Sequence, residues 1–161
     1  KENIEIQIPL TAAWRGLFAY VPQGNQLMSG TIREIIAFGD PGAMRQEERL
    51  SQALRISCAK DFVSELPDGI DTVLGERGCG LSEGQMQRIA IARAIFSERP
   101  VLILDESTSS RDETTEQVLL KNLRQMTDKT VLIITHRPAA LEICDRRIDL
   151  TEKAYSENTT A

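Results

Sequence analysis

Two continuous apolar runs late in the chain constrain its fold more than any other feature. Residues 101–104 read Val-Leu-Ile-Leu and residues 131–134 read Val-Leu-Ile-Ile, with no alternation of polar and apolar side chains. Short β-branched runs of this kind are typical of strands that are covered on both faces, as in parallel sheets. A helical pattern over 112–126, with Asp112 as N-cap, separates the two runs. The order strand, helix, strand predicts a βαβ unit and an α/β fold.

The rest of the chain suggests one domain with an insertion. Residues 3–9 have a strand pattern, residues 17–23 hold a second short apolar run, and the middle of the chain shows helical spacing without a convincing buried strand. We therefore expect a single domain that divides as follows: a sheet core from 1–23 and 97–150, an inserted and mostly helical lobe over 24–96, and a frayed polar tail over 151–161.

Composition excludes several functional classes. The 161 residues carry a net charge of −5 with no basic block, and 4% are aromatic, which argues against a nucleic-acid partner and against base-stacking platforms. Three cysteines without a CxxC and a single histidine make a zinc site or a disulfide framework unexpected, and they suit a reducing cytosol. No apolar run approaches the ~18 residues of a membrane span, so no transmembrane segment is expected.

A helix expected over 82–96 begins with Ser82-Glu83-Gly84-Gln85. The spacing of Ser82 and Gln85 is that of a capping box, which by itself stabilises a helix start. Gly84 does not fit this structural interpretation, because glycine in a helix costs about 1 kcal/mol relative to alanine. A glycine does let a ligand approach the backbone, and the free amides of a helix start suit a phosphate. Both interpretations are open from these residues alone.

Polar side chains follow three of the expected strands. Asp105 and Glu106 come directly after one apolar run, His136 ends the next, and Gln23 ends the earlier run. Each alone is explained as a cap or a turn residue. At the carboxyl edge of a parallel sheet, where ligands of such folds bind, Asp105 could hold Mg²⁺ and Glu106 could deprotonate an attacking water. His136 could touch a γ-phosphate there.

The ordered set of these segments resembles the nucleotide-binding domain of ABC transporters, a P-loop NTPase-like fold. The corresponding motifs are YVPQ (20–23) as the Q-loop, GERG (75–78) as the X-loop of exporters, LSEGQ (81–85) as the signature, VLILDE (101–106) as Walker B with its catalytic glutamate, STSSRD (107–112) as the D-loop and ITH (134–136) as the switch histidine. The resemblance extends over residues 3–150.

The resemblance implies an ATPase that works with a second copy of such a domain. Two domains would pack head to tail around two ATP molecules, and Ser82, Gly84 and Gln85 would hold the γ-phosphate of the ATP bound by the partner. Transmembrane domains outside this chain would be further partners and would keep the domain at the cytoplasmic face of a membrane. Asp112 of the D-loop is retained, and the resemblance implies that it also belongs to the nucleotide-binding residues.

The chain's own ATP would be served by a second group of residues. The resemblance implies that Gln23, Glu106 and His136 are catalytic, that Asp105 binds the nucleotide, and that Asp105 and Gln23 hold Mg²⁺. Phosphoryl transfer to water of this kind depends on positioning and electrostatics. The transported substrate is not implied by any of these residues.

Three departures from the family stand out. The sequence holds no G-x-x-x-x-G-K-[ST] P-loop. The family would have its P-loop between segments like 3–9 and 11–23, which here follow each other almost directly in the sequence. This suggests that a segment between Pro9 and Thr11 is lost or lies outside the chain. We therefore expect the isolated chain to be inactive. Glu83 stands where the signature usually has glycine, and Arg111 where the D-loop usually has an apolar residue.

Two alternative functions follow. Without a P-loop, the chain could be a non-catalytic fragment that offers its signature motif to a partner subunit, and tight ATP binding would exclude this. DNA-repair ATPases also carry a signature helix, Walker B and a D-loop. The acidic charge, the lack of coiled-coil heptads and GERG disfavour a DNA-repair function, which duplex-stimulated hydrolysis would support.

Overall fold

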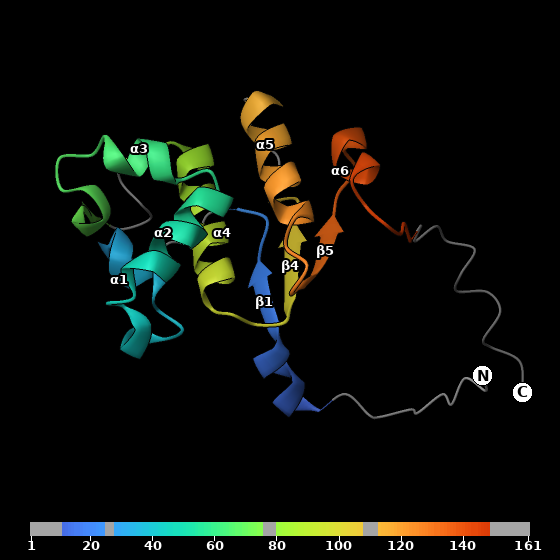
Figure 1. The fold of residues 1–161 in the computed structure, drawn as a ribbon, viewed down its shortest axis with the longest axis horizontal. Coiled ribbons are helices and arrows are strands. Elements are labelled where there is room, and N and C mark those ends of the chain that lie inside the picture. Colours follow the sequence, from blue (N-terminus) through green and yellow to red (C-terminus); the bar gives the residue numbers. More distant parts are fainter. Residues whose placement is uncertain (1–10, 25–27, 76–79, 108–112, 149–161) are drawn as a thin grey trace, which may run out of the picture.

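Three parallel strands form the centre of the structure, a computed structural model that describes residues 11–24, 28–75, 80–107 and 113–148 (Figure 1). The strands are β1 (Phe18–Val21), β4 (Val101–Asp105) and β5 (Thr130–Ile134), in the spatial order β1-β4-β5. The helix α5 (Glu113–Arg124) connects β4 to β5, and the short helix α6 (Pro138–Glu142) follows β5. This arrangement confirms the α/β fold with a parallel sheet. The strand expected over 3–9 lies outside the described residues.

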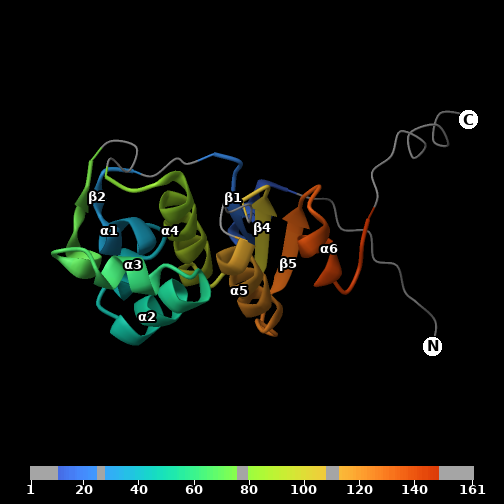
Figure 2. The same ribbon diagram turned by 90° about the horizontal axis from the view of Figure 1, so that it is seen from above.

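The register sorts the strand residues onto two faces that differ in burial. Tyr20, Ile103 and Leu132 form one row, and Ala19, Leu102 and Val131 form the adjacent row on the opposite face. The second face packs in the hydrophobic core, on the side where Figure 2 shows α5. On the first face Tyr20 is 53% and Leu132 45% exposed.

The expectation that the apolar strands are covered on both faces is therefore wrong for the described residues. The reason is topological. The crossovers from β1 to β4 and from β4 to β5 step across the sheet in the same direction. Right-handed crossovers that step in one direction place their helices on one face. Covering the other face requires a crossover that runs in the opposite direction.

Between β1 and β4 the chain forms a predominantly helical lobe (Figures 1 and 2). Its α-helices are α1 (Ile32–Ile36), α2 (Glu47–Ile56), α3 (Lys60–Ser64) and α4 (Glu83–Phe96). An antiparallel pair of two-residue strands, β2 (Gly30–Thr31) before α1 and β3 (Val73–Leu74) after α3, was not expected from the sequence. The division of the chain at 23/24 and 96/97 stays a prediction.

The helical pattern over 47–60 is interrupted in the structure. The helix α2 ends at Ile56, and α3 begins at Lys60. Between them Cys58 adopts a φ of +58°, and the Ala59 amide donates to the Leu54 carbonyl. This six-to-one bond beside a left-handed residue is a Schellman ending, which satisfies carbonyls that the helix leaves free. The apolar spacing in the sequence continues beyond the end of α2 because Cys58 still packs against the core.

Among the described helices, α4 contributes the largest number of buried residues. Its residues Ile89–Ala92 and Ala94–Phe96 are buried, and it packs against α1, α2 and β1. This burial agrees with the nearly all-apolar surface of the sequence over 82–96. Because α4 contacts both the helices of the lobe and the strand β1, it attaches the lobe to the sheet. Truncation of one buried isoleucine in α4 should cost about 2–5 kcal/mol of stability. Among the described residues, no helix is both long and apolar enough to cross a membrane.

Candidate functional site

Gln23, Glu106 and His136 come together beyond the carboxyl ends of the three strands. Gln23 follows β1, Glu106 directly follows β4, and His136 follows β5. The Gln23 Nε2 atom donates to Glu106 Oε2 at 2.5 Å, and His136 Nδ1 lies 3.2 Å from Glu106 Oε1. The Glu106 carboxylate is thus held at both oxygens by residues that are 83 and 30 positions away in the sequence.

The backbone of Glu106 adopts an unusual conformation. Its φ is +47°, in the left-handed region, and its amide donates to the Ile134 carbonyl at 2.9 Å. This hydrogen bond extends the pairing of β4 and β5 by one residue and fixes where the side chain begins. A non-glycine residue costs about 1–3 kcal/mol in such a conformation, and such residues cluster at functional sites. No sequence signal predicted this conformation.

Tyr20 is a neighbour of the site that the sequence did not predict. Its hydroxyl donates to Asp105 Oδ2 at 2.8 Å. This hydrogen bond, then partial burial and the nearby negative charge, raises the pKa of Tyr20 above its ordinary value. The parallel register of β1 and β4 puts both side chains on the exposed sheet face. The sequence could have indicated this contact only through the tyrosine in the strand before Gln23, if that strand had been placed beside the strand that ends at Asp105.

The donor set at this edge fits a hard divalent cation. The Asp105 Oδ1 atom and the Gln23 amide oxygen are not used in the hydrogen bonds described above, because Gln23 binds Glu106 through Nε2 and Tyr20 binds Asp105 Oδ2. Carboxylate and amide oxygens are the ligands that Mg²⁺ prefers, usually with several waters and substrate phosphates. The described residues form no cluster of three or more acidic, histidine or cysteine ligands, so a cation here would need those additional ligands.

The start of α4 forms a second, separate group. Ser82 Oγ accepts from the Gln85 amide at 3.2 Å, and Gln85 Oε1 accepts from the Ser82 amide at 2.8 Å. This confirms the reciprocal capping box as a structural role. A Cβ atom placed on Gly84 would meet nothing within 4 Å, so the described fold does not require glycine there. The structural interpretation explains Ser82 and Gln85 but leaves Gly84 without a reason.

Other motif residues lie outside the described part of the chain. Asp112 and Arg111 of the D-loop stretch fall in 108–112, most of the GERG stretch falls in 76–79, and both ranges are outside the described residues. Their expected roles stay predictions. The same holds for the roles of Gln23, Asp105, Glu106 and His136, of which the structure gives the positions.

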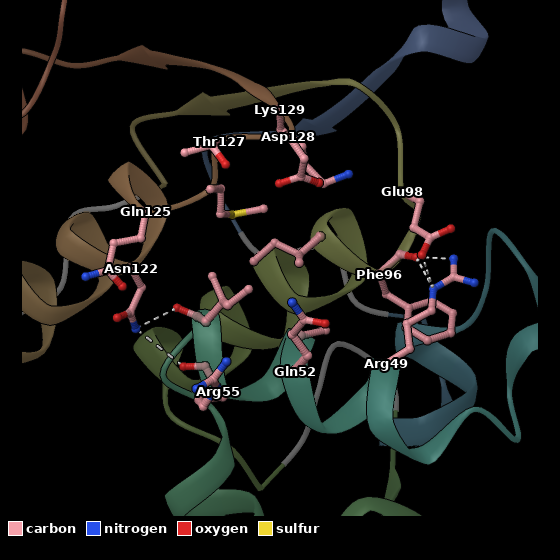
Figure 3. Close-up of a pocket in the computed structure, with 14 residues that line it drawn as sticks. Arg49, Gln52, Arg55, Phe96, Glu98, Asn122, Gln125, Thr127, Asp128 and Lys129 are labelled. Carbon is pink, nitrogen blue, oxygen red and sulfur yellow. Dashed lines mark hydrogen bonds and ion pairs between the residues drawn. The ribbon is translucent and has the colours of Figure 1, made fainter.

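A pocket of about 340 Å³ lies elsewhere, between α2, α4 and α5 (Figure 3). It is on the amino-end side of the sheet, where Glu98 precedes β4 and Lys129 precedes β5. Arg49 donates to the Phe96 carbonyl, and Asn122 donates to the Ile56 carbonyl at 3.2 Å. These side chains cap the carboxyl ends of α4 and α2, which explains the polar lining. None of the expected site residues lines this pocket.

Comparison with known proteins identifies the family of the chain. Residues 2–109 match the family model described as "ABC transporter". An uncharacterized ABC transporter ATP-binding protein, YwjA of Bacillus subtilis, is 40% identical over 157 residues, which cover 97% of this chain and 27% of that protein. The cyclolysin secretion/processing ATP-binding protein CyaB of Bordetella pertussis is 43% identical over 143 residues, 88% of this chain and 20% of that protein.

A solved structure is also similar. The structure of a bacterial Atm1-family ABC exporter with ATP bound matches with a TM-score of 0.70 and 40% identity, over 76% of this chain and 21% of that chain. The chain thus spans about a quarter or less of the length of the relatives it matches. Proteins of this family bind and hydrolyse ATP when intact. By the match over residues 2–109 and by these relatives, the chain belongs to the ABC transporter family, as part of an exporter-type ATP-binding domain.

Proposed function

We propose that this chain is part of an ATP-hydrolysing motor in which Glu106 activates the attacking water. The observation that supports the proposal is the convergence of Gln23 and His136 on the Glu106 carboxylate at the carboxyl edge of the sheet. Two contacts on one carboxylate restrain its orientation, which a general base needs in order to reach the proton that it takes from water.

The remaining residues of this edge bind and orient. Asp105 and Gln23 would hold Mg²⁺ through carboxylate and amide oxygens, and Tyr20 restrains one Asp105 oxygen through a 2.8 Å hydrogen bond. ATP would supply the phosphoryl group, and Mg²⁺ would neutralise the negative charge that develops on it. His136, whose side chain is 80% exposed, can reach a phosphate beyond the sheet edge.

The start of α4 would serve the ATP bound by a second domain. Ser82 and Gln85 keep the helix start in place, and the open space at Gly84 lets a phosphate approach free amides. Glu83 is exposed and negatively charged in the same turn. We expect the negative charge of Glu83 to weaken the binding of a phosphate at this helix start. Replacement of Glu83 should therefore improve the binding of the partner's ATP.

The proposal requires a P-loop from additional polypeptide, because the sequence contains none. The exposed sheet face that includes Tyr20, Leu132 and Ile134 supports this, as does the position of β5 at an edge of the described sheet. A strand beside β5 followed by a helix over this face would be the missing opposite crossover. Its strand-to-helix turn would then stand at the same edge as Glu106.

In the intact protein we expect a dimer of such domains, joined to transmembrane domains at the cytoplasmic face of a membrane. ATP-driven closure of the dimer would power export. The support is the similarity to secretion and exporter proteins, of which this chain matches only a part.

The decisive test is ATP turnover of the polypeptide that joins this chain to its P-loop, with Glu106→Gln. We expect turnover to fall by at least about 10²-fold, the contribution of a general base. Glu113→Gln, an exposed carboxylate on α5, is the matched control and should retain full turnover. Undiminished hydrolysis in Glu106→Gln would overturn the proposal.

A second candidate, a non-catalytic fragment that presents its signature helix to another subunit, is favoured by the absence of a P-loop sequence. Titration of Mg-ATP against the isolated chain tests it. We expect no one-site binding at micromolar ATP, and tight binding would exclude this candidate.

A further inference from the structure

Glu116 and Arg137 form an ion pair that no expected motif includes. Glu116 lies on α5 and is 3% exposed, and its Oε2 atom accepts from Arg137 Nη1. Arg137 lies between β5 and α6, and its side chain is 37% exposed. The pair therefore joins α5 to the segment that follows β5.

The pair is difficult to explain as a stabilising device. Among the described residues, Glu116 Oε1 is buried without a hydrogen-bond partner. Taking a carboxylate out of water is costly, and a buried pair with incomplete hydrogen bonding often stabilises no more than apolar residues of the same volume. The neighbouring inward positions of α5 are Leu119, Leu120 and Leu123, so an apolar residue would suit this face. The presence of the Glu116 carboxylate on this face therefore points to a role other than stability.

The segment that Arg137 holds carries His136. The Arg137 amide donates to Thr135 Oγ1 at 3.0 Å, and Pro138 after it disfavours helical backbone at Arg137, whose ψ is 129°. The His136 ring lies 3.2 Å from Glu106, yet its side chain is 80% exposed, so little packing restrains it. Its position then depends on its backbone, and Arg137 ties this backbone to α5.

We propose that Glu116 and Arg137 are positioning residues that hold His136 against Glu106. This inference rests on the proposed ATPase function of the site. The pair acts through the backbone of residues 135–137 and does not itself contact the Glu106 carboxylate. Loss of either charge frees this segment and lets the exposed ring leave Glu106.

The first test needs no ATP, because His136 is the single histidine of the chain. Imidazole ¹⁵N spectra of the chain report its Nδ1 atom alone. We expect Glu116→Gln and Arg137→Gln to shift the Nδ1 signal towards that of a free histidine peptide, and the double variant to shift it no further. Arg124→Gln, an exposed arginine at the end of α5, should leave it unchanged. Unshifted signals in both single variants would overturn the inference.

The second test measures ATP turnover in the polypeptide that includes the P-loop. We expect kcat to fall about tenfold in Arg137→Gln with KM for ATP within twofold, because ring placement affects the reaction and not ATP capture. Arg137→Lys keeps the charge and guards against loss of folding, and it should recover most of kcat. Wild-type kcat in Arg137→Gln, when Glu106→Gln is inactive, would refute the positioning role alone. Activity in Glu106→Gln would instead refute the proposed function.

Discussion

Glu106 and His136 meet at 3.2 Å across the ends of two adjacent parallel strands, and Glu106 does so with a left-handed backbone. The Glu106 amide is tied to the Ile134 carbonyl, two residues before the histidine. The same pair of strands thus supplies both side chains and the hydrogen bond that sets their separation. Strain at one residue accompanies this arrangement, which suggests that position matters more than local stability here.

Glu106→Gly should not reduce the stability of the chain. Glycine adopts a φ of +47° without the cost of about 1–2 kcal/mol that a Cβ incurs, although its flexible unfolded state offsets about 0.5–1 kcal/mol. We expect the free energy of unfolding in urea to rise by up to about 1 kcal/mol. Gln117→Gly, at an exposed interior position of α5, should lower it by about 1 kcal/mol as a control. A clear loss of stability in Glu106→Gly would show that the side-chain contacts outweigh the strain.

Gly84→Ala should separate folding from function at the start of α4. The added methyl group meets nothing within 4 Å, and Gly84 has a helical conformation, so stability should rise by about 0.4–1 kcal/mol. ATPase activity of the dimeric protein should fall, because the methyl group occupies the approach to the helix amides. Unfolding and turnover are measured on the same variant. Full activity together with raised stability would remove Gly84 from the site.

Ser82→Ala should destabilise the chain, in contrast to the glycine substitution. It removes the hydroxyl that accepts from the Gln85 amide, which typically costs about 0.5–2 kcal/mol. If Ser82 also binds phosphate, turnover should fall much further than the loss of folded protein explains. Thr31→Ala removes the equivalent cap of α1 and is the matched control, which should lose stability without a specific loss of turnover.

Acid should weaken the attachment of α1 to its neighbours. The Arg33 guanidinium binds Asp71 at 2.7 Å and lowers the pKa of that carboxyl below its ordinary value. A carboxyl with a lowered folded pKa contributes stability above its unfolded pKa, near 3.9, and loses it as the pH falls through the folded pKa. The slope of unfolding free energy against pH below 4 should therefore be smaller in Asp71→Asn. Identical slopes would show that the exposed pair contributes nothing.

The same substitution should have unequal effects on the two faces of the sheet. Leu102→Ala, on the buried face, should cost about 2–5 kcal/mol. Leu132→Ala, on the face where that residue is 45% exposed, should cost less than about 1 kcal/mol in this chain, because less apolar surface returns to water. In a polypeptide with the proposed covering helix, Leu132→Ala should become several times more costly. Equal small costs in both polypeptides would argue against that helix.

Local patterns predicted much of the fold. The apolar runs at 101–104 and 131–134 became β4 and β5, the run before Gln23 became β1, and the capping box at Ser82 formed as expected. These features depend on neighbours in the sequence, because a short apolar run indicates a strand and the spacing of two residues indicates a helix cap. The ordered motifs likewise predicted that three strand ends would share one edge.

Features that involve distant residues could not be predicted in this way. Tyr20 and Asp105 are 85 positions apart, and their hydrogen bond depends on the register of β1 and β4. The continuous helical pattern over 47–60 hid the left-handed Cys58 that ends α2. The apolar run of β5 resembled a strand covered on both faces, although the described crossovers cover one.

The sequence by itself determined which elements form and which side chains stand at the strand ends, because hydrophobic period and capping act within a few residues. The tertiary structure decided what those side chains meet. It brought Gln23 and His136 to Glu106, placed Glu106 in a left-handed conformation and joined Glu116 to Arg137. Such contacts depend on strand register and crossover hand, which are set by the packing of the whole sheet and lobe and not by any one segment.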